Sequence, residues 1–203
     1  AGSAGCGVAD HLYYSMLQMG YDEQAVRDRF WLIDRQGLIF DDQTDLHSSQ
    51  AKFARPASER PLYDQYDLAS VVRGMKPTVL IGSSAVAGAF TPEILADVVR
   101  LVQRPVILPL SNPTSRAEAS PEQIYQATNG QAFVATGSPF ASFEFNGHTI
   151  MTGQCNNAYA FPGIGLGVVA VKARRITQQM LSAASEAISD CVVRNDYSEH
   201  LIT

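Results

Sequence analysis

Short apolar runs alternate with helix starts through residues 77–137, and this alternation limits the possible fold more than any other feature. The pattern predicts strands over 78–81, 106–110 and 132–137. Thr91-Pro92-Glu93 and Ser120-Pro121-Glu122 each combine a capping residue, a proline and an acid, which is typical of a helix start. Strands that alternate with helices predict an α/β fold, a parallel sheet with helices on both faces.

The chain begins with the small residues Ala1-Gly2-Ser3-Ala4-Gly5, which lead into an apolar helical pattern over 8–19. Glycines allow a tight turn and a close approach of backbone N–H groups to a pyrophosphate at the start of a helix. Such runs also occur in ordinary loops. The strand expected before this turn is missing. We therefore predict a Rossmann-like doubly wound sheet whose first strand is cut off, in a fragment of a longer protein.

Phe30-Trp31-Leu32-Ile33 reads as a buried parallel strand that ends at Asp34. An acid at the end of the second strand is where nucleotide-binding folds hold the adenosine ribose. An extra helix over 23–29 would account for the long spacing from Gly5. The alternative is a solvated turn residue before Arg35, and we favour the ribose role.

Small or amide side chains also follow the other predicted strands, where ligands bind in open α/β sheets. They are Gly82, Ser83, Ser84 and Asn112. Residues 41–66 are polar and predict a surface loop. Asn146-Gly147 predicts a hairpin turn.

Asn156 and Asn157 stand in the otherwise apolar segment 154–167. Amides are costly to bury without partners, so they either meet a ligand or cap a turn. Gly163, Gly165 and Gly167 would let a helix or loop lie very close to the sheet or to a nicotinamide. A last amphipathic helix should start at the cap Thr177 and turn Met180, Leu181, Ala184 and Ile188 inward.

The composition is that of a globular chain, with 203 residues of which 46% are hydrophobic and 17% charged. A net charge of −5 without a basic run argues against nucleic acid or an anionic membrane as partner. Without a long apolar stretch we expect no transmembrane helix. Three cysteines without a C-x-x-C pattern favour reduced thiols and a cytoplasmic location.

Seven segments resemble the NAD-binding domain of malic enzyme. They occur in the family's order and at its spacing over about residues 1–193, and their sequences are most similar to those of bacterial NAD-dependent members. They are AGSAG (1–5), IDRQGLI (33–39), KPTVLIG (76–82), FTPE (90–93), PLSNPTSRAE (109–118), ATGSPF (135–140) and QCNNAYAFPGIGLG (154–167). The family oxidises L-malate with NAD or NADP and decarboxylates the product to pyruvate and CO2. It uses Mg or Mn as a Lewis acid.

The resemblance implies a role for each matched residue. Gly2, Ser3, Ala4 and Gly5 would hold the pyrophosphate, Asp34 with its neighbour Arg35 the adenosine ribose, and Gly82, Ser83 and Ser84 the length of the cofactor. Asn112 would lie between the nicotinamide ribose and malate, and Asn156 and Asn157 near the malate carboxylate and the nicotinamide.

The family's tyrosine acid, lysine base and acidic metal ligands lie upstream of the glycine turn, so we expect no catalytic or metal residue in this chain. Asp10, Asp41, Asp42 and Asp45 match by type only. The chain alone should be inactive and bind cofactor weakly. The family is usually dimeric or tetrameric, so we expect a homo-oligomer.

The choice between NAD and NADP depends on few residues. Asp34 repels a 2′-phosphate, although Arg35 could offset that. NADP members carry a lysine that aligns with Gln50, while Lys52 is two residues away. We favour NAD. Two other readings stay open: another Rossmann-type dehydrogenase, or a nucleotide-binding regulatory module.

Overall fold

A computed structural model describes residues 1–191 of the chain. The helices are α1 (Ser3–Gln18), α2 (Glu23–Arg27), α3 (Ser48–Ala51), α4 (Leu68–Met75), α5 (Pro92–Leu101), α6 (Pro121–Thr128), α7 (Phe161–Ala170) and α8 (Gln178–Asp190), with short 3-10 helices η1 (Ala57–Leu62), η2 (Thr114–Arg116) and η3 (Asn157–Tyr159). The strands are β1 (Ile33–Asp34), β2 (Gly37–Leu38), β3 (Val79–Gly82), β4 (Val106–Pro109), β5 (Phe133–Thr136), β6 (Phe143–Phe145), β7 (His148–Ile150) and β8 (Gly153–Gln154).

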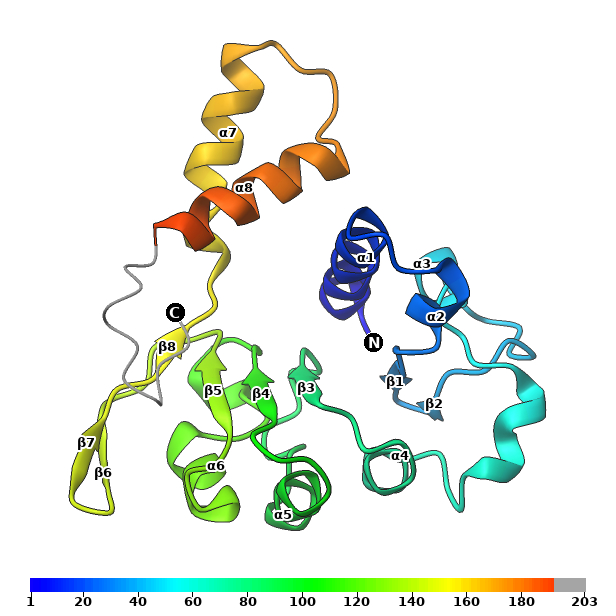
Figure 1. Ribbon diagram of the computed structural model, residues 1–203, viewed down its shortest axis with the longest axis vertical. Coiled ribbons are helices and arrows are strands. Elements are labelled where there is room, and N and C mark those ends of the chain that lie inside the picture. The colour runs from blue at the N-terminus through cyan, green and yellow to red at the C-terminus, as the bar shows by residue number, and fades with distance from the viewer. Residues whose placement is uncertain (192–203) are drawn as a thin grey trace.

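Four parallel strands form the centre of the molecule in the order β3-β4-β5-β8 (Figure 1). Val79 lies opposite Val106, and Val106 lies opposite Phe133. These β-branched and aromatic side chains fit a pleated, half-buried surface. The α/β class and the Rossmann-like parallel sheet predicted from the alternation of strands and helices are confirmed.

Helices α4, α5 and α6 form one layer beside this sheet (Figure 1). Leu80, Ile107 and Val134 project into that layer and are at most 7% exposed. Each such side chain contributes roughly 1.5–3 kcal/mol of hydrophobic stabilisation. The residues between them face the other side of the sheet, where Val79 is 45% exposed. The two faces of the sheet are therefore unequally covered.

Helix α1 has its own apolar cluster, made with the segments around α2 and α3. Gly20 follows the end of α1 and has a φ of +87°. Asp22 caps the next helix, α2, by accepting from the Ala25 N–H at 3.0 Å. The predicted hairpin is also confirmed, because Asn146 and Gly147 join β6 to β7 with φ values of 50° and 77°.

The predicted parallel strand over residues 30–33 is wrong. Only Ile33 and Asp34 pair, and they pair antiparallel with β2 across a turn that ends at Gly37, whose φ is +97°. Trp31 instead donates its indole N–H to the Tyr63 hydroxyl at 3.2 Å. The surface loop predicted over 41–66 is wrong in part, since it contains α3 and η1 and buries Phe53.

Helices α7 and α8 stand apart from the sheet, with α8 reaching back towards α1 (Figure 1). Thr177 caps α8 as predicted, accepting from the Met180 N–H at 3.3 Å. The inward apolar face is only partly buried, and Ile188 remains 38% exposed. In residues 1–191 we find no helix long and apolar enough to cross a membrane.

Candidate cofactor site

The start of α1 is shaped to receive an anion. The helix begins at Ser3, with Gly2 as its N-cap and without a side-chain cap. Its first backbone N–H groups, on Ser3, Ala4 and Gly5, have no acceptor one turn earlier within the helix, and the helix dipole adds positive potential there. A Cβ built on Gly2 would meet nothing within 4 Å in the described residues.

Gly5 does not form a turn with positive φ; it lies where α1 approaches the loop after β3. It lies inside α1, and a Cβ there would come within 2.5 Å of the Ser83 hydroxyl oxygen. Gly2 itself has a φ of −76°. The glycine turn expected from the sequence is thus a helix start, and glycine is needed where that helix meets the loop after β3.

Asp34 lies beside this helix start. Its carboxylate accepts from the Arg35 backbone N–H at 2.8 Å and from the Gln50 side-chain amide at 2.7 Å. The same Gln50 amide donates to the Ala1 carbonyl at 3.0 Å, which ties the glycine segment to Asp34. The pKa of Asp34 is lowered from 3.8, chiefly because the Arg35 N–H donates to the carboxylate. The Arg35 side chain is exposed.

Lys52 points elsewhere. Its ammonium pairs with Asp10 of α1 and lies 3.8 Å from the centre of the Tyr13 ring. Gln50 and not Lys52 therefore faces Asp34, which agrees with the alignment that pairs Gln50 with the lysine of NADP members.

The predicted amides meet at the carboxyl edge of the sheet. Ser138, after β5, donates its hydroxyl to the Asn112 side chain, and Asn156 donates to the Gly137 carbonyl at 2.9 Å. Asn156 also caps η3 by accepting from the Ala158 N–H at 2.9 Å. Asn157 is exposed within η3. The loop after β5 thus connects Asn112 with Asn156. The predicted capping of a turn is confirmed for Asn156, and contact of these amides with a ligand stays a prediction.

The close approach predicted for Gly163, Gly165 and Gly167 is wrong. All three lie in α7, and a Cβ on any of them meets nothing within 4 Å. Helix α7 is not packed on the sheet, so these positions need no glycine for packing within the described chain.

Sequence reasoning missed the buried carboxylate of Glu118. It is 0% exposed and accepts from both the backbone N–H and the hydroxyl of Ser84 at 2.7 Å. Glu118 ends the matched segment PLSNPTSRAE (109–118), but the resemblance implied no role for it. Its neighbours Ala117 and Ala119 do not separate a buried acid from a surface one.

The side chains of the described residues do not fit Mg or Mn. Among residues 1–191 no three His, Cys, Asp or Glu side chains lie close enough together to hold a metal. Oxygen-rich clusters are what these cations require.

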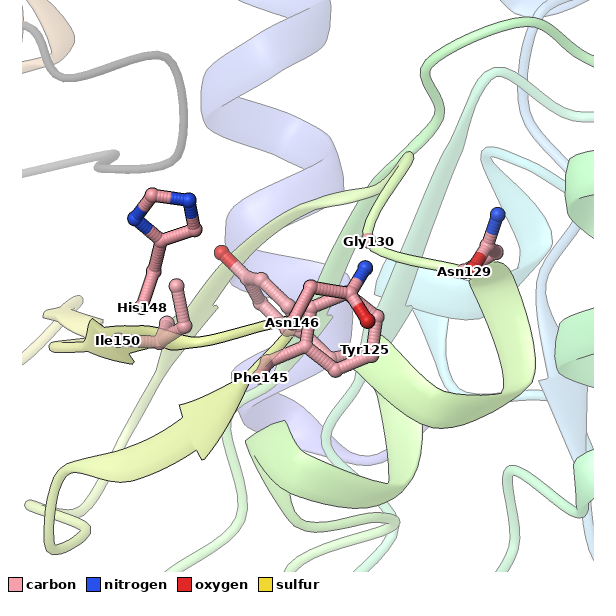
Figure 2. Close-up of a pocket in the computed structure, with 7 residues that line it drawn as sticks. All are labelled: Tyr125, Asn129, Gly130, Phe145, Asn146, His148 and Ile150. Atoms are coloured by element: carbon pink, nitrogen blue, oxygen red, sulfur yellow. The ribbon is translucent and has the colours of Figure 1, made fainter.

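A cleft of about 260 Å³ lies between the end of α6 and the β6–β7 hairpin (Figure 2). Figure 2 shows Asn129 and Gly130 on one side and His148 and Ile150 on the other. Asn129 and Gly130 lead into the amino end of β5, opposite to the strand ends where ligands bind in parallel sheets. This cleft is therefore separate from the candidate cofactor site.

A family model described as "Malic enzyme, NAD binding domain" matches residues 1–203. The chain belongs to the malic enzyme family. It is 46% identical over 195 residues to an NAD-dependent malic enzyme of Shewanella frigidimarina, covering 94% of this chain and 35% of that protein. Similar matches are the NAD-dependent malic enzyme of Sodalis glossinidius (48% identical, 94% and 34% covered) and NAD-dependent malic enzyme 3 of Bacillus subtilis (46% identical, 95% and 35% covered).

The chain spans about a third of the length of these relatives. Membership of the malic enzyme family confirms the resemblance found in the seven sequence segments. The family description also confirms that the segment is an NAD-binding domain.

Proposed function

We propose that the chain is the NAD-binding domain of a larger enzyme that oxidises L-malate and decarboxylates the product to pyruvate and CO2. The relatives named NAD-dependent malic enzyme are about three times longer than this segment, which supports a second domain. That second domain would supply the catalytic acid, the base and the Mg or Mn ligands. The whole enzyme would be a cytoplasmic homo-oligomer.

The observation that carries the proposal is that Gln50 ties the glycine segment at the start of α1 to Asp34. The N–H groups of Ser3, Ala4 and Gly5 would donate to the pyrophosphate of NAD, and the absence of a side chain on Gly2 leaves room for it. Asp34 would accept hydrogen bonds from the ribose diol, because each carboxylate oxygen offers two acceptor sites and each accepts one hydrogen bond here.

The loops after β3, β4 and β8 would place the rest of the cofactor and the substrate. Gly82, Ser83 and Ser84 would line the cofactor, and Asn112 would lie between the nicotinamide ribose and malate. Asn156 and Asn157 would orient the malate carboxylate, since neutral amides donate to a carboxylate without burying a cation. When bound, NAD accepts the hydride from C2 of malate.

The selection of NAD over NADP would rest on Asp34 and Gln50. A carboxylate at Asp34 repels a 2′-phosphate, and Gln50 beside it brings no positive charge. Lys52, which could have supplied that charge, is paired with Asp10. Arg35 is also near Asp34, but its side chain is exposed, so solvent and salt would screen its attraction for a 2′-phosphate.

The test uses the full-length protein with L-malate, Mn and either NAD or NADP, and follows reduced cofactor and pyruvate together. We expect both products in equal amounts with NAD. Reduced cofactor with oxaloacetate and without pyruvate would identify a simple malate dehydrogenase. NAD binding without turnover would leave only a nucleotide-binding module. The segment 1–203 alone should show no turnover.

A further inference from the structure

Glu118 is a charged side chain in the interior of the domain, next to the candidate cofactor site. It lies between η2 and α6 and is 0% exposed. A buried carboxylate is costly unless donors satisfy it. Its partners are neutral: the Ser84 N–H and hydroxyl, both at 2.7 Å, and the Ser111 hydroxyl at 2.6 Å and N–H at 3.4 Å.

The two serine hydroxyls are held in one orientation. The Ala85 N–H donates to the Ser111 hydroxyl oxygen at 2.9 Å, and the Val86 N–H donates to that of Ser84 at 3.2 Å. Each hydroxyl therefore accepts from the backbone and has its own hydrogen left for Glu118. Three of these donors converge on Oε1, and the Ser111 N–H approaches Oε2 at 3.4 Å. The two oxygens of a carboxyl group can accept from all four, whereas a glutamine would turn its NH2 group towards at least one of them.

These bonds connect two loops at the carboxyl edge of the sheet. Ser84 and Ala85 follow β3, while Ser111 follows β4 and immediately precedes Asn112. Ala85 has a φ of 55°, an unfavourable conformation for a residue with a side chain, and its N–H is bound to Ser111. The backbone adds a further tie, because the Phe90 N–H donates to the Glu118 carbonyl at 3.0 Å.

The carboxylate also fills the space beneath the end of β3. A Cβ on Gly82 would come within 2.5 Å of the Glu118 carboxyl carbon. The side chain therefore has no room to move away from its partners on that side.

We propose that Glu118 is a positioning residue for NAD: its carboxyl group fixes the loops after β3 and β4, through Ser84 and Ser111, so that Ser83 and Asn112 face the cofactor. This inference rests on the proposed function, since it requires NAD to bind along those loops. Glu118 itself does not touch the cofactor. It acts through Ser84 and Ser111.

The experiment compares the dissociation constant for NAD in the full-length wild-type protein and in Glu118→Gln, well below the unfolding temperature. Glutamine keeps the shape but turns an NH2 group towards donors. We expect NAD to bind about tenfold more weakly, the effect of mismatching one buried hydrogen-bond partner. Val98→Ala, at a buried position of α5, is the control for lost stability. It should lower the unfolding temperature and leave the dissociation constant within about twofold, because Val98 belongs to neither loop.

Ser111→Ala keeps the experiment decisive if Glu118→Gln does not fold. It removes one of the carboxylate's donors and the acceptor of the Ala85 N–H, and we expect about fivefold weaker binding. The double variant should be no weaker than about tenfold, since both changes release the same loops. Folded single variants that bind NAD like the wild type would overturn the inference. A wild-type protein that binds no NAD would instead overturn the proposed function.

Discussion

Gly137 is the position where one added methyl group should disturb both stability and the site. A Cβ there would lie 2.1 Å from the Leu110 carbonyl oxygen, whereas ordinary van der Waals contact begins at 3.4 Å. The obstacle is backbone, which cannot rotate away as a side chain can. The Gly137 N–H donates to the Pro109 carbonyl at 3.2 Å and its carbonyl accepts from Asn156 at 2.9 Å, so any shift moves the ends of β4 and β5.

The magnitude follows from that overlap. Overpacking a well-packed region costs about 1–3 kcal/mol, and an obstacle made of backbone places Gly137→Ala at about 3 kcal/mol. For a domain of this size each kcal/mol lowers the unfolding temperature by about 2–4 °C, so we expect a fall of roughly 6–12 °C. NAD should also bind more weakly, because Asn112 and Asn156 are linked through this loop.

Thermal unfolding followed by circular dichroism measures the effect, with Gly7→Ala as the matched control. Gly7 lies inside α1, and its Cβ would meet nothing within 4 Å. That change should stabilise the protein by about 0.5–1 kcal/mol through helix propensity. If Gly137→Ala unfolded within about 1 °C of the wild type, the close approach of the β4 and β5 loops would be refuted.

Three further changes test the neighbouring elements. Gln50→Lys should raise kcat/KM for NADP relative to NAD, because an ammonium beside Asp34 would meet the 2′-phosphate. Lys52→Gln is the control and should leave that ratio unchanged, because Lys52 pairs with Asp10. An unchanged ratio in Gln50→Lys would contradict the role assigned to Gln50. Ser120→Ala removes the capping box with Gln123 and should lower the free energy of unfolding by about 1 kcal/mol in urea titrations, whereas Ser120→Thr should keep most of it. The pKa of Asp34 is lowered in the folded protein, so its contribution is complete above the ordinary carboxyl pKa of 3.8 and is lost as the pH falls through the lower folded value. Asp34→Asn should therefore flatten the acid side of the stability profile, and a profile identical to the wild type would argue against that ionised contact.

The sequence predicted the parallel strands and the helix starts because those signals are local. An apolar run such as 106–110, placed between a proline and a polar turn, favours a strand, and Ser120-Pro121 favours a helix start without any distant contact. These predictions did not depend on knowing which segments would meet.

The errors arose where the partner of a segment decides its structure. Residues 30–33 have the composition of a buried strand, yet hydrophobicity does not say what covers a side chain. Gly37 reverses the chain, and Trp31 packs near Tyr63 and Arg55. Glu118 was missed for the same reason, since only the fold shows that four donors surround it.

The position of β3 at the end of the strand order has a practical consequence for producing this segment as recombinant protein. Thr78 and Gly82 accept from β4 at 3.0 and 2.9 Å, so by the alternation of a parallel ladder the polar backbone groups of Val79 and Ile81 point outwards. An exposed strand edge with an apolar side chain recruits strands from other molecules. Expressed by itself, the segment will tend to precipitate through this edge, and Val79→Lys is the change that should keep it in solution.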